Sequence, residues 1–209
     1  MEILRRFLKD SKVEIRKNDD DKRTIRGYGA VFDKRSEDMG FIEIIAPGAF
    51  DDVLSDDVRG LWNHDSNIVL GRTVADTMRI GVDKRGLWYE IDPPSWADGH
   101  IETVDRGDVS QSSFGFSIAE SGDELSKEGD NVVRTITKIG RLFDVSPVAY
   151  PAYPDTESEA RSLMQRAQDM GIISVGRSGD EGERARELEL MEMERCQQYD
   201  DHYATDLVI

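Results

Sequence analysis

Alternation between apolar and small polar residues is the feature that most limits the folds open to this chain. In Val109–Ile118, VSQSSFGFSI, successive residues of an extended strand would point to opposite faces. One face then carries two phenylalanines and an isoleucine, and the other carries Ser113, Gly115 and Ser117. The glycine leaves room for a backbone or a ligand to approach Ser113 closely. The segment is therefore predicted to be a strand with one face in the core and with Ser113 as a candidate nucleophile on the other.

The same alternation recurs from about Arg23 to Pro154 and predicts a mainly β domain. Within it, RIGVDKRGLWYEIDPP is typical of a hairpin whose turn lies at Asp83–Gly86. Helix-forming composition is confined to two short segments there, GAFDDVLSDD and SWADGHIETVDRG. We therefore expect an α+β fold that is mainly β with flanking helices.

Beyond residue 156 the composition changes to charged residues that favour helices, interrupted by the linker-like GIISVGRSGDEGE. The last helical segment has no wide apolar stripe, so it is not expected to contribute to the core. We predict three parts: a lead-in at residues 1–22, a β-rich domain at residues 23–156, and an acidic, partly helical or disordered tail at residues 157–209.

Charge balance and cysteine content limit the classes of function. A net charge of −16 over 209 residues disfavours direct nucleic-acid binding, which needs clustered lysines and arginines. The single cysteine, Cys196, permits neither an internal disulfide nor a cysteine-rich zinc site. No apolar run is long enough to span a membrane, and the N-terminal residues lack the pattern of a secretory signal. We expect a protein of a reducing compartment that binds neither nucleic acid nor membrane.

Two further residues qualify for chemistry with Ser113. Of the three histidines, His64 lies where an apolar strand meets a turn expected at residues 65–67, and such a position can face a cleft from a rigid support. The alternative is an ordinary solvent-exposed turn histidine. Asp144, in GRLFDVSPVAY, interrupts a segment otherwise suited to burial, where a carboxylate needs a partner. That partner is either the Nδ1–H of a histidine or a structural ion pair or backbone group.

His64, Ser113 and Asp144 together indicate nucleophilic catalysis, in which a carboxylate orients the histidine that takes the serine proton. Their order along the chain differs from that in chymotrypsin-like proteases and in subtilisins. Gln111 also stands where the nucleophile elbow of α/β-hydrolases requires glycine, so a different fold must carry the three residues. A metal-dependent hydrolase using His64, Asp65 and acidic neighbours is an alternative, although paired-histidine spacing is missing.

Four motifs in order resemble the tailed-phage prohead (capsid maturation) protease family, which is grouped with the herpesvirus assemblins. They are GAF after IIAPG, LWNHD with LGRT, SSFGF, and LFDVSPVAYPAYPDT, and the resemblance runs from about Ile25 to Thr156. It implies an assemblin-like β-barrel flanked by helices, here followed by the helical C-terminal tail. It also implies a serine endopeptidase that removes scaffolding segments of capsid proteins and cleaves itself.

By position, the resemblance implies that His64 is the general base, Ser113 the nucleophile and Asp144 the acidic third member. Ser112 is a rival nucleophile, but alternation sends it to the face of the phenylalanines. No cofactor and no metal are expected. The implied partners are the major capsid protein with its scaffolding segment, and the chain itself through self-cleavage or a homo-oligomer. The implied location is the host cytoplasm, inside the assembling prohead. A catalytically inactive structural or scaffolding relative of the same fold is the alternative.

Overall fold

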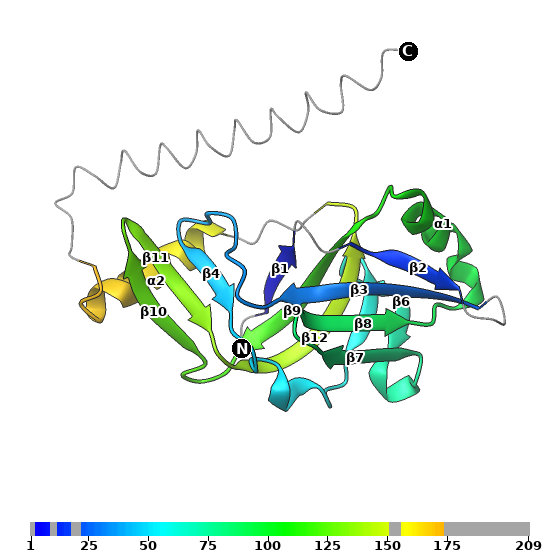
Figure 1. Cartoon of the computed structure of the whole chain (residues 1–209), viewed down its shortest axis with the longest axis horizontal. Coiled ribbons are helices and arrows are strands. Elements are labelled where there is room, and N and C mark those ends of the chain that lie inside the picture. The colour runs from blue at the N-terminus through cyan, green and yellow to red at the C-terminus, as the bar shows by residue number, and fades with distance from the viewer. Residues whose placement is uncertain (1–2, 9–11, 18–21, 151–155, 174–209) are drawn as a thin grey trace, which may run out of the picture. The chain divides into compact units, whose positions relative to one another are not determined.

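The computed structural model describes residues 3–8, 12–17, 22–150 and 156–173. The chain divides into two compact units, residues 1–162 and residues 163–209. All the described strands belong to the first unit, together with helix α1 (Asp98–Arg106). The second unit begins within helix α2 (Thr156–Asp169). The described residues therefore form a mainly β fold with two α-helices, as the alternating sequence predicted (Figure 1).

The described strands form three hydrogen-bonded sheets. The five-stranded sheet has the order β1-β9-β12-β5-β6, the four-stranded sheet β2-β3-β8-β7, and the three-stranded sheet β10-β11-β4. The strands are β1 (Leu4–Leu8), β2 (Glu14–Lys17), β3 (Arg23–Val31), β4 (Ile42–Ile45), β5 (Arg59–Trp62), β6 (Asp65–Arg72), β7 (Met78–Val82), β8 (Gly86–Ile91), β9 (Gln111–Ile118), β10 (Asp123–Glu128), β11 (Asn131–Ile136) and β12 (Ile139–Val148).

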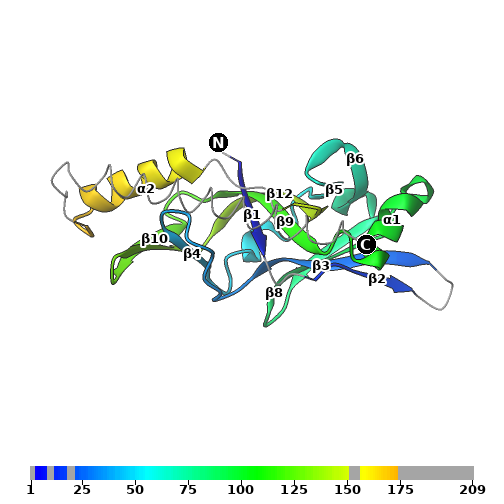
Figure 2. The same ribbon diagram turned by 90° about the horizontal axis from the view of Figure 1, so that it is seen from above.

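Most neighbouring strands are antiparallel, and the pairs β4–β11 and β5–β12 are parallel. Each sheet keeps two edge strands, so the pairing of the described strands does not close the barrel that the resemblance implied. Figure 2 shows β1 beside β9, at the edge of the five-stranded sheet. No helix in the described part of the chain is long and apolar enough to cross a membrane.

The local predictions outside the site have mixed outcomes. The hairpin is confirmed, because the Asp83 amide donates to the Gly86 carbonyl at 3.0 Å between β7 and β8. Helix α1 is also confirmed, and Gly107 follows it at a φ of 88° as a left-handed cap. The helix expected in GAFDDVLSDD is wrong, because only Asp51–Val53 form a single 3-10 turn. One such turn already buries Phe50 and Val53, which lie three residues apart.

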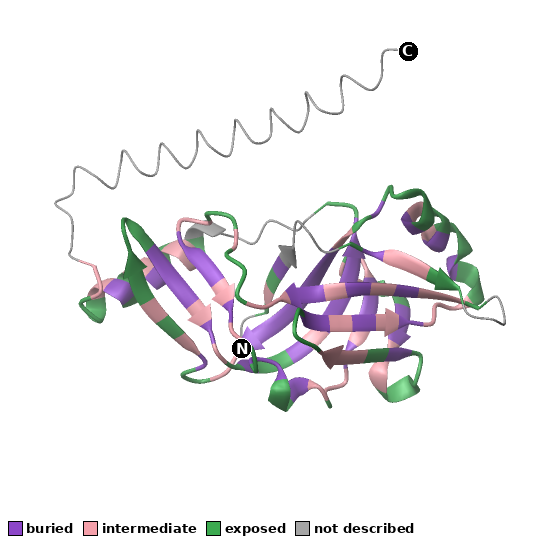
Figure 3. Ribbon diagram, in the orientation of Figure 1, coloured by how far each residue is buried: buried purple, intermediate pink, exposed green. Residues whose placement is uncertain are grey.

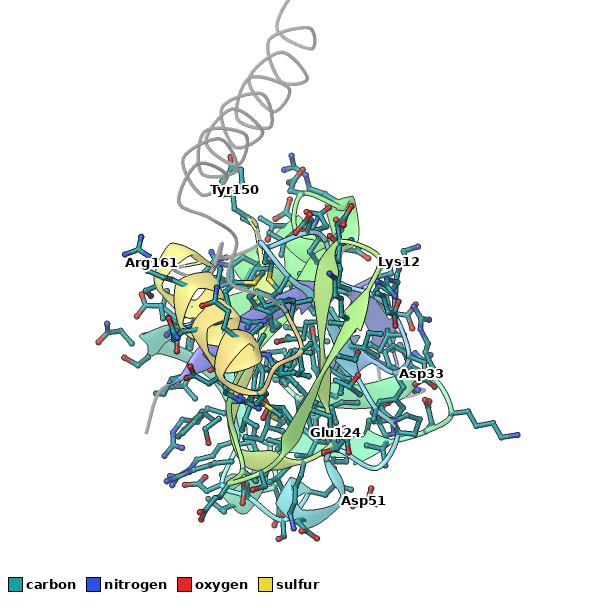
Figure 4. All side chains as sticks on the ribbon, turned by 90° about the vertical axis from the view of Figure 1, so that its left-hand side faces the viewer. Lys12, Asp33, Asp51, Glu124, Tyr150 and Arg161 are labelled. Atoms are coloured by element: carbon teal, nitrogen blue, oxygen red, sulfur yellow. The ribbon has the colours of Figure 1, made fainter. Side chains whose placement is uncertain are left out.

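Strand β9 lies at the centre of the core and is buried on both faces. Its six residues from Ser112 to Ser117 are all buried, as the continuous purple of β9 in Figure 3 shows. On one face the rings of Phe114 and Phe116 stack with centroids 4.7 Å apart. Strand β10 is the contrast: Glu124 is exposed on it (Figure 4). The strand that carries the candidate serine is thus among the most rigidly enclosed elements of the fold.

Candidate active site

His64 is the second residue of a two-residue hairpin turn between β5 and β6. Asn63 and His64 have φ angles of 51° and 58°, the left-handed conformation that a type I′ turn requires at both central positions. The turn is anchored to the end of β12. The Asn63 amide donates to the Pro147 carbonyl at 3.0 Å, and Asn63 Oδ1 accepts from the Ala149 amide at 2.8 Å. The imidazole is therefore positioned by a strained, well-anchored turn and not by a free loop.

This turn comes earlier than the sequence suggested. The expected turn residues 65–67 instead begin strand β6, and Asp65 pairs with Trp62 across the hairpin. Asp65 Oδ1 accepts from the Asn67 amide at 2.8 Å, so its turn-forming side chain is used within the strand end. His64 is thus in the turn and not at the end of the preceding strand.

Ser113 lies at the middle of β9, opposite Ser146 on β12 and Phe7 on β1. Its Oγ is 2.6 Å from His64 Nε2 and 2.9 Å from the carbonyl oxygen of Arg6. The sequence suggested an accessible nucleophile, yet Ser113 is 0% exposed. The hydroxyl lies between His64 and the Arg6 carbonyl of β1, a strand that the sequence did not predict.

Ser112 points to the opposite face of β9, as alternation predicted. Its Oγ is 2.7 Å from the hydroxyl of Tyr89 on β8, and both residues are 0% exposed. Burial raises the pKa of the Tyr89 hydroxyl, with a smaller opposing effect of its hydrogen bond to Ser112. Ser112 therefore takes part in a hydrogen bond of the core, whereas Ser113 contacts His64.

Asp144 lies on β12 with its Oδ1 2.5 Å from His64 Nδ1. Simple alternation would place it on the same face as Leu142, but the strand register shifts between these two residues. Leu142 is opposite Phe116 on the core face, whereas Asp144 is opposite Gly115 on the Ser113 face. A β-bulge therefore turns the carboxylate out of the core and toward the imidazole.

Gly115 makes room for this carboxylate. A Cβ added at Gly115 would collide with Oδ2 of Asp144, which lies directly across the strand pair. The glycine in SSFGF is thus explained by the close approach of a side chain from β12, two residues along β9 from Ser113.

Ser146 is the member of the site that sequence reasoning did not single out. Its Oγ donates to Asp144 Oδ1 at 2.8 Å and lies 3.3 Å from His64 Nδ1. It is 0% exposed and shares a face with Asp144, two residues earlier. That spacing on a predicted strand was the available signal, because residues i and i+2 lie on one face.

Arg6 joins the site to a buried charge cluster. Its guanidinium donates to Glu43 Oε1 at 2.7 Å and to Glu159 Oε1 at 2.6 Å, and Arg134 contacts the same two carboxylates. The four side chains are between 3% and 9% exposed. Burial acts to raise the pKa of Glu43, but the charges of Arg6 and Arg134 outweigh it and lower that pKa overall. Two arginines and two glutamates thus balance in charge within the fold.

The arrangement of His64 suits proton transfer from a serine. The carboxylate of Asp144 accepts only, so Nδ1 carries the proton and donates to it, which leaves Nε2 as the acceptor toward Ser113. Of the other histidines, His100 lies on α1 with its ring centroid 4.6 Å from that of Trp62, and His202 is outside the described residues. No group of three or more potential metal ligands occurs in the described part of the chain.

Comparison with known protein families gives a match over most of the chain. The family described as caudovirus prohead serine protease matches residues 11–169, which include His64, Ser113, Asp144 and Ser146. No curated protein and no solved structure matches the chain. The matched span covers more than half of the sequence and nearly all of the described strands. The chain therefore belongs to the caudovirus prohead serine protease family.

Proposed function

We propose that this protein is a serine endopeptidase of phage capsid maturation in which Ser113 is the nucleophile, His64 the general base and Asp144 the residue that orients and stabilises the imidazole. The observation that carries the proposal is the continuous chain of contacts through both nitrogens of one imidazole, 2.5 Å to the carboxylate and 2.6 Å to the hydroxyl. Membership in the prohead serine protease family supports the same chemistry.

In the proposed mechanism His64 Nε2 takes the proton of Ser113 Oγ as that oxygen attacks the carbonyl carbon of the scissile peptide bond. Asp144 stabilises the imidazolium that forms, and Ser146 holds the carboxylate in place. The tetrahedral intermediate collapses to an acyl-enzyme as His64 gives its proton to the leaving amine. Water, deprotonated by His64, then attacks the ester and releases the second product.

The proposed substrates are the scaffolding segments of capsid proteins, including the major capsid protein, and the chain itself. The proposed setting is the assembling prohead in the host cell. We further propose that residues 23–156 form an assemblin-like protease domain, to whose sheets the lead-in at residues 1–22 contributes strands β1 and β2. The tail at residues 157–209 would carry the enzyme into the prohead, because its acidic excess suits a reversible electrostatic contact. Most of that tail is outside the described residues.

The test is co-expression of the chain with the major capsid protein proposed as its substrate, followed by intact mass measurement of both. Ser113→Ala and His64→Ala should each abolish cleavage, and the double variant should be scarcely worse, because such residues act as a unit. Asp144→Asn should retain residual activity only. Ser112→Ala is the matched control and should still cleave. Cleavage by Ser113→Ala would refute the nucleophile assignment, and sensitivity to chelators would favour a metal-dependent hydrolase.

A further inference from the structure

Strand β1 occupies the edge of the sheet that carries the candidate nucleophile. It pairs antiparallel with β9 through five residues, with Phe7 opposite Ser113. On its other side β1 has no sheet neighbour among the described strands. Without β1, β9 itself would be the edge strand, and its main-chain groups beside Ser113 would be available to another extended chain (Figure 2).

The main chain of β1 also engages the reactive hydroxyl. The Arg6 carbonyl oxygen lies 2.9 Å from Ser113 Oγ, close to the distance between that hydroxyl and His64 Nε2. The hydroxyl has one proton, so when it donates to the Arg6 carbonyl it cannot donate to the imidazole. With β1 in place Ser113 is fully buried and its proton is shared with a group that takes no part in catalysis.

The side chain of Arg6 fixes β1 in this position. It is buried between Glu43 on β4 and Glu159 on α2, at 2.7 and 2.6 Å. The neighbouring Arg5 is exposed, as is Arg161 on the outer face of α2 (Figure 4). If β1 left, Glu43 and Glu159 would share Arg134 alone, and one buried negative charge would have no partner. A chain that brings another basic side chain would restore the balance.

We propose that the edge of β9 is the docking site for an extended segment of the polypeptide substrate, that this segment carries a basic residue which takes the place of Arg6 between Glu43 and Glu159, and that β1 holds the site closed in the free chain. The proposal rests on the proposed function and specifies its substrate. Main-chain pairing with β9 supplies affinity, and the acidic pair supplies selectivity for lysine or arginine. The scissile carbonyl of the substrate then takes the place of the Arg6 carbonyl beside Ser113 Oγ. The substrate residue that follows it takes the place of Phe7 in β1.

The test compares full-length variants by their rate of labelling with a fluorophosphonate, which reacts with an activated serine. Arg6→Ala should label about tenfold or more faster than wild type, because the open state is no longer a minor population. Arg5→Ala is the matched control and should label within about twofold of wild type. A synthetic peptide of residues 1–12 should slow labelling of Arg6→Ala, and the same peptide with Arg6→Lys should also do so. The peptide with Arg6→Ala should not.

Equal labelling rates for wild type and Arg6→Ala, or equal inhibition by all the peptides, would overturn the inference. If Arg6→Ala does not fold, hydrogen exchange of the wild-type chain before and after labelling tests whether β1 leaves β9. The amides of Leu4–Leu8 should then exchange faster after labelling, and unchanged protection would overturn the inference. Cleavage of the capsid protein that depends on Ser113 separates the two proposals: if it occurs without these effects, only the docking site fails. If neither cleavage nor labelling occurs in any variant, the proposed function fails.

Discussion

Replacing Gly115 by alanine tests whether the close approach of β9 and β12 positions the catalytic carboxylate. The new Cβ would collide with Asp144 Oδ2, so the carboxylate must retreat by more than about 1 Å to restore ordinary van der Waals contact. The other carboxylate oxygen, Oδ1, contacts His64 Nδ1 at 2.5 Å and Ser146 Oγ at 2.8 Å, and neither contact survives such a movement unchanged. The substitution therefore acts on the imidazole without touching it.

A displacement of about 1 Å in a catalytic group costs on the order of 100-fold in rate, which is about 2.7 kcal/mol of transition-state stabilisation. Loss of the carboxylate's function altogether in Asp144→Asn should cost about 10⁴-fold. We therefore expect Gly115→Ala to lie between wild type and Asp144→Asn. Its free energy of unfolding should fall by about 1–3 kcal/mol, as for other insertions of a methyl group into a packed core.

The assay is the rate of fluorophosphonate labelling of Ser113, with the urea midpoint of each variant measured alongside. Gly115 is opposite Arg5 of β1, so hydrogen exchange of Leu4–Leu8 in both chains checks that the pairing of β1 is the same. Gly99→Ala on α1 is the matched control: its Cβ would meet nothing within 4 Å, and it should label normally and gain up to about 1 kcal/mol. The double variant with Asp144→Asn should be no slower than Asp144→Asn alone. A folded Gly115→Ala that labels within about threefold of wild type would refute the reasoning.

Three further predictions concern hydrogen bonds and buried charge. Ser146→Ala should lower the labelling rate about tenfold and cost about 1 kcal/mol of stability, whereas Ser117→Ala, whose Oγ has no partner among the described residues, should change neither. Hydrogen bonds from Arg79 lower the pKa of Asp92 to about 2. The stabilising contribution of the Asp92 carboxylate should therefore be present above about pH 4 and disappear as the pH falls toward 2. In urea titrations Asp92→Asn should lack this pH dependence. Glu43 also has a lowered pKa, so its carboxylate should stabilise the fold above its unfolded pKa and lose that effect at lower pH. Glu43→Gln should remove this pH dependence and lower the free energy of unfolding by about 3–5 kcal/mol. An unchanged urea midpoint would contradict the role of the charge cluster.

The sequence by itself determined that the chain is mainly β and which face each side chain of β9 takes. Alternation placed Ser113 and Ser112 on opposite faces of β9, and the structure gives them different partners, His64 and Tyr89. The hairpin at Asp83–Gly86 followed from local turn chemistry in the same way. Such features depend on the backbone and side-chain preferences of a few neighbouring residues, and these preferences follow from the residue types alone.

The tertiary structure alone decided how the strands meet. The bulge that separates Leu142 from Asp144 exists only in register with β9, because an extra residue on one strand is defined by its partner. The separation of the described strands into three sheets and the position of β1 beside Ser113 likewise depend on which strands pair, and pairing joins segments far apart in sequence. Alternation repeats every two residues on every strand, so it carries no information on partner or register. That choice is made by cross-strand contacts such as Gly115 with Asp144, and by the buried charges that hold Arg6.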